Sequence, residues 1–166
     1  DYLLDKRGYD LTGLNRSSVE GVKNHRADIA KLEDIKPAFV GQDVVVHLAA
    51  YLGSEGWKWQ QDNNVVGTYN VFEAARLAGV KRIIFASSGA TIMGFEQVQP
   101  YKDLANGVFD EIPNDLSMIT CDQVRPAGVY GATKVWGEAL GRHYSDEYDM
   151  SVICVRIGSV RKENRP

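Results

Sequence analysis

Two stretches decide how this sequence folds, and they read Phe85-Ala86-Ser87-Ser88-Gly89 and Tyr130-Gly131-Ala132-Thr133-Lys134. The first contains the end of a β-branched run, Lys81 to Ser87, which predicts a strand. The second opens a segment of helical period that runs to Tyr148, and another strand is predicted at Ser151 to Ile157. A strand, a helix and a strand in succession indicate a βαβ unit and a parallel sheet.

The residues upstream continue this alternation. Asp43 to Ala50 is apolar through its middle, which is typical of a strand that helices cover on both faces, and Gln61 to Ala78 predicts a helix that Gly79 ends. The remaining predicted elements are the last turns of a helix at Asp1 to Arg7, a strand at Tyr9 to Asn15, an extended piece at His25 to Asp28, and a helix around Lys31 to Val40 that Pro37 can distort. The pattern predicts a Rossmann-type α/β fold, a doubly wound parallel sheet in one domain over residues 1–166.

Composition and charge narrow the class of protein. The 166 residues are 44% hydrophobic and 25% charged, which suits one domain with a core. A net charge of -3 gives no basic face for nucleic acid, and no apolar run approaches the roughly 18 residues that span a bilayer, so neither partner is expected. Cys121 and Cys154 lie far apart in the sequence, which fits a reducing compartment and predicts a cytoplasmic protein. The three histidines lack metal-ligand spacing, so no metal is expected.

Ligands of open parallel sheets bind beyond the carboxyl ends of the strands, so residues that follow the strands are candidates for a site. Asn15 and Arg16 follow the first strand, where such folds usually offer an acid to the adenosine ribose. A neutral amide does not repel a 2′-phosphate and Arg16 could pair with one, which favours NADP over NAD. A solvated turn is the alternative interpretation.

Small and amide side chains mark the next strand end and the helix after it. Ala49 and Ala50 are small enough for a dinucleotide to lie against the backbone, although simple packing explains them equally well. Asn64 could bridge strand backbones or hold a water near the site, and a plain helical turn competes with that hypothesis. His47 is assigned no chemistry.

Tyr130 and Lys134 stand one helical turn apart, so their side chains share a face. A nearby ammonium stabilises a phenolate and prepares a tyrosine to exchange protons. Tyr2 and Lys6 have the same spacing, so spacing alone decides nothing. The position of Tyr130, after the strand that ends in Ser87 and Ser88, carries the functional interpretation.

Taken together, these stretches resemble the extended short-chain dehydrogenase/reductase superfamily, and within it the NAD-dependent epimerase/dehydratase family. The matching segments are Ala27-Asp28-Ile29, His47-Leu48-Ala49-Ala50, Asn64-Val65-Val66-Gly67-Thr68, Phe85-Ala86-Ser87-Ser88, Tyr130-Gly131-Ala132-Thr133-Lys134 and Val155-Arg156-Ile157-Gly158. The resemblance implies that Asp28 and Ile29 touch the adenine and that Leu48, Ala49 and Ala50 line the dinucleotide. The expected cofactor-binding set also includes Asn64, Ser87, Ile157, Tyr130 and Lys134.

The resemblance further implies that Tyr130 exchanges the proton of a sugar hydroxyl while hydride passes to or from the nicotinamide, and that Lys134 holds the nicotinamide ribose. Gly89 stands where many members carry the catalytic Ser or Thr, so we expect Ser88 to be the hydroxyl partner, with Ser87 or Thr91 as alternatives. Ala90 and Thr91 replace the Asp-Glu pair of the nucleotide-sugar dehydratases, which argues against water elimination.

Within the family the chain looks closest to uronate dehydrogenases, through the runs Phe85 to Ser88, Ile92 to Phe95 and Arg156 to Ser159. The sequence contains no Gly-x-x-Gly-x-x-Gly loop. We therefore expect a partial dinucleotide-binding domain, truncated at both ends, that lacks the first βα unit and the C-terminal substrate domain. On its own it is expected to bind cofactor weakly or not at all and to have no turnover.

The sequence thus predicts an NAD(P)-dependent oxidoreductase or epimerase that acts on a hydroxyl of a sugar, uronic acid or nucleotide sugar. The alternative is a catalytically silent dinucleotide sensor or scaffold of the same fold, which Gly89 and the missing loop favour. The resemblance implies a homodimer of the intact protein through the predicted helices Gln61 to Ala78 and Tyr130 to Tyr148. Gln97 to Arg125 has no clear period, and a flap over the substrate is a hypothesis for it.

Overall fold

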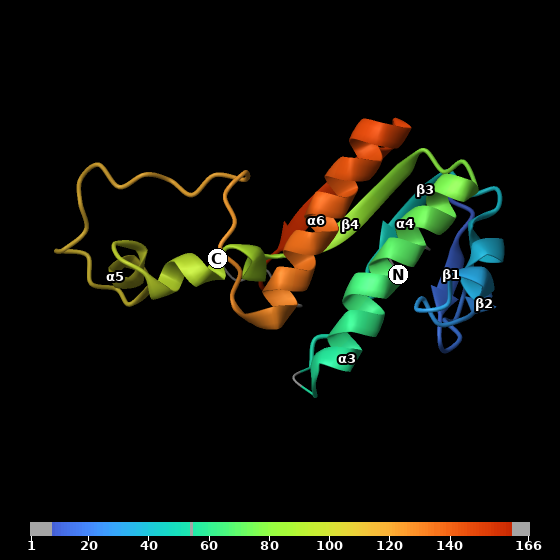
Figure 1. The fold of residues 1–166 in the computed structure, drawn as a ribbon, viewed down its shortest axis with the longest axis horizontal. Coiled ribbons are helices and arrows are strands. Elements are labelled where there is room, and N and C mark those ends of the chain that lie inside the picture. Colours follow the sequence, from blue (N-terminus) through green and yellow to red (C-terminus); the bar gives the residue numbers. More distant parts are fainter. Residues whose placement is uncertain (1–7, 54, 161–166) are drawn as a thin grey trace.

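The computed structural model describes residues 8–53 and 55–160 (Figure 1). The strands are β1 (Thr12–Asn15), β2 (Lys23–Arg26), β3 (Val44–His47), β4 (Arg82–Ser88) and β5 (Ser151–Ile157). The α-helices are α2 (Leu32–Ile35), α3 (Trp57–Gln60), α4 (Gly67–Leu77), α5 (Tyr101–Ala105) and α6 (Gly128–Tyr148). Shorter helical turns are η1 (Lys36–Phe39), η3 (Gly89–Thr91) and η4 (Met93–Gln97), and η2 (Gln61–Val66) is a π-helix. The predicted helix at Asp1 to Arg7, with Tyr2 and Lys6, lies outside the described residues.

All the strand pairings are parallel, which confirms the predicted Rossmann-like α/β fold. β3, β4 and β5 form one sheet in that order, with His47 beside Phe85 and Ser88 beside Ile157. β1 and β2 form a second, two-stranded sheet in which Asn15 lies beside Arg26. A pocket of about 270 Å³, lined by residues of β1 and of β3, separates the two sheets.

α4 and α6 lie side by side on one face of the three-stranded sheet (Figure 1). Their inner faces bury Phe72 and Tyr144, and the Phe72 ring packs edge to face with both Phe85 of β4 and Tyr144. Gly137 permits this approach, because a Cβ atom at this position would collide with the Phe85 ring. The carboxyl ends of β4 and β5 are thereby fixed relative to the start of α6.

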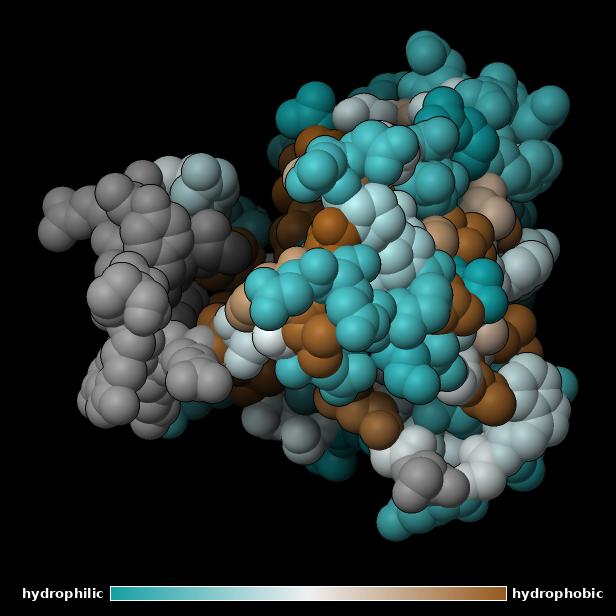
Figure 2. All heavy atoms as spheres, turned by 90° about the vertical axis from the view of Figure 1, so that its left-hand side faces the viewer, coloured by the Kyte–Doolittle hydropathy of each residue, from teal (hydrophilic) through white to brown (hydrophobic). Residues whose placement is uncertain are grey.

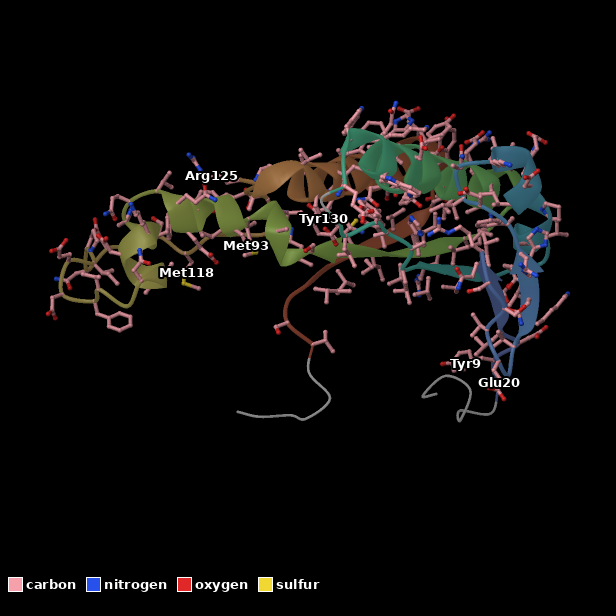
Figure 3. All side chains as sticks on the ribbon, turned by 90° about the horizontal axis from the view of Figure 1, so that it is seen from below. Tyr9, Glu20, Met93, Met118, Arg125 and Tyr130 are labelled. Carbon is pink, nitrogen blue, oxygen red and sulfur yellow. The ribbon has the colours of Figure 1, made fainter. Side chains whose placement is uncertain are left out.

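The opposite face of this sheet corrects the expectation for β3. In the described part of the chain, helices cover one face only (Figure 3), and Val44 and Val46 are 45% and 48% exposed. Ile153 and Val155 of β5 lie exposed as well. The apolar run predicted the strand correctly, but a run of valines cannot reveal which segment covers the second face.

Helix boundaries differ from the predictions where local geometry changes. The helix expected at Gln61 begins earlier, at Trp57, and passes through the π-helical segment before α4. The helix expected around Lys31 to Val40 changes from α to 3-10 geometry at Lys36, next to Pro37. Proline cannot donate an amide hydrogen and restricts the preceding residue, which accounts for the change.

The stretch without a clear period forms an arm, residues 95–124, that projects from the body beyond β4 (Figure 1). It contains most of η4 and all of α5, and several of its apolar side chains are exposed, Met118 by 85%. Figure 2 views the molecule from the side on which the arm projects and shows apolar residues interspersed among hydrophilic ones. Gly94 N–H donates to the Arg125 carbonyl at 2.8 Å, which closes the base of the arm.

Candidate active site

Tyr130 lies in the first turn of α6, and this turn packs against the turn that follows β4. Ala127 N–H donates to the Ala90 carbonyl at 2.9 Å, and Gly131 fits there because a Cβ atom would lie 2.5 Å from the same oxygen. Tyr130 is half-buried and lines a pocket of about 420 Å³, which we call the tyrosine pocket. Its hydroxyl has no hydrogen-bond partner among the described residues. The phenol is therefore open to a ligand.

Lys134 reaches the same place from one turn further along α6. It is 3% exposed, its Nζ atom lies 5.7 Å from the Tyr130 ring centroid, and it donates to the Ala86 carbonyl at 2.8 Å. Burial lowers the pKa of Lys134 to about 8. The structure thus brings the predicted pair together. The Lys134 ammonium lies near the Tyr130 ring and is held by the backbone of β4.

The three candidate hydroxyls after β4 differ in what they bind. Ser87 is buried and donates to Glu138 at 2.5 Å, and Thr91 is buried and donates to the Ser88 carbonyl at 2.8 Å. Ser88 Oγ accepts from Ala90 N–H at 3.1 Å, so its own proton remains available. Ser88 is therefore the hydroxyl best able to donate to a ligand, and Ile157 lies beside it on β5.

Asn64 organises the loop after β3 and lies in the π-helical segment. Its side chain accepts from Tyr51 N–H at 2.7 Å and donates to the Tyr51 carbonyl at 2.9 Å. It also lies 3.3 Å from Thr133 Oγ1, which in turn donates to the Tyr130 carbonyl at 2.7 Å. Asn64 thus holds both backbone groups of Tyr51 in the loop, not the strand backbones that one hypothesis named, and it ties the loop to the helix that carries Tyr130.

Residues predicted to bind the adenine, its ribose or the dinucleotide line one pocket of about 150 Å³, which we call the adenosine pocket. It is lined by Asn15, Arg16, Asp28, Ile29, Ala49 and Ala50. Leu48 lies in the adjoining pocket between the sheets. One Asp28 carboxylate oxygen accepts from Ala30 N–H at 3.0 Å, which fixes the turn after β2. Small side chains beside a carboxylate and an amide fit the ribose and base of a dinucleotide.

A second, open pocket adjoins the adenosine pocket on its outer side. It has a volume of about 370 Å³ and is lined by Arg16, Arg26, Ala27 and Asp28. Arg26 ends β2 beside Asn15, which is why the two arginines meet. Sequence reasoning missed Arg26, although the alignment of two strand ends could have indicated it. Asn63, which also lines the adenosine pocket, was noticed in the sequence but given no role.

A partly buried ion pair next to Ser87 was also missed. Arg156 Nε and Nη2 donate to Glu138 at 2.9 and 2.8 Å, and Arg156 Nη1 donates to the Gln123 carbonyl at 3.2 Å. Burial opposes ionisation of Glu138, but the hydrogen bonds from Arg156 and Ser87 outweigh it and lower its pKa. The pair joins β4, β5 and α6 to the base of the arm. The signal for it was a glutamate one turn after Lys134.

His47 is packed in the protein interior. It is 4% exposed, its Nε2 atom lies 3.2 Å from Thr68 Oγ1, and its ring lies 5.7 Å from that of Phe85. Burial, assisted by the charge of Lys134, lowers the pKa of His47 to about 3 and keeps it neutral.

Residues 8–53 and 55–160 contain no helix long and apolar enough to cross a membrane.

The sequence of this chain is similar to those of known proteins. The profile of the NAD dependent epimerase/dehydratase family matches residues 2–161. The chain is 34% identical over 153 residues to L-arabinose 1-dehydrogenase (NAD(P)(+)) of Haloferax volcanii, covering 90% of this chain and 58% of that protein. It is 32% identical over 138 residues to a uronate dehydrogenase of Agrobacterium fabrum, covering 83% and 46%.

The fold agrees with these relatives. A crystal structure of a mutant uronate dehydrogenase from Agrobacterium tumefaciens complexed with NAD superposes with a TM-score of 0.72 and 28% identity, covering 92% of this chain and 52% of that one. The predicted likeness to uronate dehydrogenases is confirmed, and the chain spans about half the length of the relatives it matches. The chain belongs to the NAD dependent epimerase/dehydratase family.

Proposed function

We propose that the full-length protein transfers a hydride between NAD(P) and a hydroxyl-bearing carbon of a sugar, uronic acid or nucleotide sugar. One observation carries this proposal. Tyr130 lines a pocket with its hydroxyl unpartnered among the described residues, and the buried Lys134 ammonium lies 5.7 Å from its ring, so one group can exchange a proton with a ligand and the other can stabilise the resulting charge. The family relatives support the same reaction class.

The residues of this chain divide the work. In the oxidative direction, Tyr130 accepts the proton of the sugar hydroxyl, and Ser88 donates a hydrogen bond to the same oxygen. Lys134, which is itself buried, stabilises the phenolate at short range. Bound nicotinamide supplies the acceptor or donor of the hydride. The Ser87, Glu138 and Arg156 network supports the turn that carries Ser88.

The cofactor proposed is NADP in preference to NAD. Asn15 offers no negative charge to repel a 2′-phosphate, and Arg16 and Arg26 line the open pocket next to the adenosine pocket. Two guanidinium groups can bind one phosphate by charge-assisted hydrogen bonds. We propose that residues 1–166 form only part of the dinucleotide-binding domain, so that this chain alone binds cofactor weakly, which calorimetry tests.

A homodimer is proposed for the intact protein through the outer faces of α4 and α6. Tyr69 and Leu77 of α4 are 44% and 51% exposed, and Trp136 of α6 is 41% exposed. Light scattering of the full-length protein tests this, and Trp136→Asp is expected to yield monomers. We also propose a cytoplasmic protein, because Cys121 and Cys154 are free thiols. Fractionation of cells tests the location.

The decisive experiment incubates the full-length protein with NAD or NADP and a panel of aldoses, uronic acids and nucleotide sugars. Net reduction of cofactor identifies a dehydrogenase, and a new sugar without net reduction identifies an epimerase. Tight cofactor binding with no conversion of any sugar would contradict the proposal and favour a dinucleotide sensor.

A further inference from the structure

The side chains that line the tyrosine pocket are mostly apolar. It lies between the loop after β3 and the first turn of α6, and its walls include Leu52, Gly56, Trp57 and Val129 around Tyr130. Leu52 and Trp57 are 75% and 57% exposed, although both are large apolar residues. Large exposed apolar side chains in a concave site mark a surface that a ligand covers.

Apart from Tyr130, the polar and charged side chains in or next to this pocket already have partners. Gln60 donates to the Gly53 carbonyl at 2.9 Å and accepts from Asn64 at 2.5 Å, so both ends of its amide are used. Lys58, the cation nearest in sequence to Trp57, pairs with Asp62 at 2.7 Å. No lysine, arginine or histidine lines the pocket in the part of the chain that the structure describes.

The one acid of the loop beside the pocket, Glu55, already has a partner. The Tyr51 hydroxyl donates to Glu55 at 2.7 Å, and the Tyr51 ring stacks on Trp59 at 5.8 Å. Asn64 holds the backbone of Tyr51 on both sides, so this conformation is fixed from within. A carboxylate on a ligand in this pocket would thus lose water without gaining a cation from the residues that line it.

We propose that the tyrosine pocket binds the ring of an uncharged sugar, and that the protein prefers a neutral aldose to the corresponding uronate. The C–H face of the sugar packs on the negative face of the Trp57 indole, with Leu52 and Val129 beside it. The reacting hydroxyl then lies at Tyr130, the one polar side chain of the pocket with no partner among the described residues. This inference rests on the proposed function and names its substrate class.

The test compares matched sugars with the full-length protein. D-Galactose and D-galacturonate, and D-glucose and D-glucuronate, differ only in whether the sixth carbon carries an alcohol or a carboxylate. We expect kcat/KM to be at least about tenfold higher for the neutral member of a pair that is turned over. Trp57→Ala should lower kcat/KM for the neutral sugar by about tenfold, mainly through KM, since the indole holds the ring without touching the transferred proton.

Three further variants make the test specific. Trp57→Phe should restore most of the loss, because a ring face returns. Leu52→Arg should shift preference toward the uronate by supplying a cation. Tyr9→Ala removes an aromatic side chain that is 65% exposed and lies at the far end of the molecule from Tyr130 (Figure 3), and it should change nothing.

The outcomes separate this inference from the proposed function. A wild-type preference for the uronate, or an unchanged kcat/KM for the neutral sugar in Trp57→Ala, would overturn the neutral-sugar inference while hydride transfer stands. If no sugar is converted and calorimetry with cofactor present detects no sugar binding, both are overturned.

Discussion

The regions around the tyrosine pocket and the adenosine pocket, here called the tyrosine end and the adenosine end, hold their side chains in different ways. At the tyrosine end, Lys134 is 3% exposed and hydrogen-bonded to β4, and Ser87 is 3% exposed and bonded to Glu138. At the adenosine end, Arg16 and Arg26 project from the ends of short strands and are exposed. The first end is preorganised by burial and the second relies on charge. Substitutions should therefore cost most at the tyrosine end.

The largest effect is expected from Tyr130→Phe. Loss of the proton-exchanging hydroxyl should lower kcat/KM by about 10³-fold, since general acid–base catalysis contributes roughly 10² to 10⁴. The melting temperature should stay unchanged, because the hydroxyl has no hydrogen-bond partner among the described residues. Steady-state kinetics and calorimetry measure both, and Tyr9→Phe is the control. Retention of most activity would mean that another group exchanges the proton.

Glu138→Ala should produce the largest loss of stability. It leaves Arg156, whose side chain is 19% exposed, without its partner, and unfolding should become easier by about 3 kcal/mol. Glu33→Ala breaks an exposed pair with Lys36 and should cost less than about 1 kcal/mol. Urea unfolding of the two variants compares a preorganised pair with a solvated one. Equal losses would show that burial adds nothing here.

Lys134→Met should change the pH dependence of stability. Burial lowers the pKa of Lys134 to about 8, so between about pH 8 and 10.5 the unfolded chain binds a proton that the folded chain has released. This lysine therefore makes wild-type stability rise with pH in that window. The difference in unfolding free energy between wild type and Lys134→Met should follow this slope, and a flat difference would mean that the ammonium is not desolvated.

The smallest effects belong to the adenosine end. Arg16→Gln and Arg26→Gln should each lower kcat/KM for NADP by about tenfold and leave the value for NAD nearly unchanged. Stability should hardly change, since neither side chain forms an ion pair among the described residues. Lys23→Gln, which neutralises another exposed cation of β2, is the matched control. An equal response to both cofactors would place the 2′-phosphate elsewhere.

Local patterns in the sequence were enough to predict much of this molecule. β4, β5 and α6 follow directly from period and β-branching, and the pairing of Tyr130 with Lys134 needs only one helical turn. Asn15, Arg16, Asp28 and the alanines after β3 converge because parallel strands bring their carboxyl ends to one edge.

Other features depend on contacts between segments far apart in the chain. The tyrosine pocket needs the Trp57 turn to meet the start of α6, and the Glu138–Arg156 pair needs α6 to lie across β5. No local period in the sequence predicts these contacts between distant segments. α5 was missed for a different reason, because five residues form little more than one turn and show no repeat.

The closed base of the arm has a consequence for how this fold can vary. Gly94 and Arg125 are joined by a backbone hydrogen bond, and Arg125 N–H donates to the Thr91 carbonyl at 2.9 Å, so the chain leaves and rejoins the body at one point. The length of the arm between these two residues therefore does not determine where the helix that carries Tyr130 lies. Replacing the arm by a short turn, or by a different segment, should leave the Tyr130 helix in its present position.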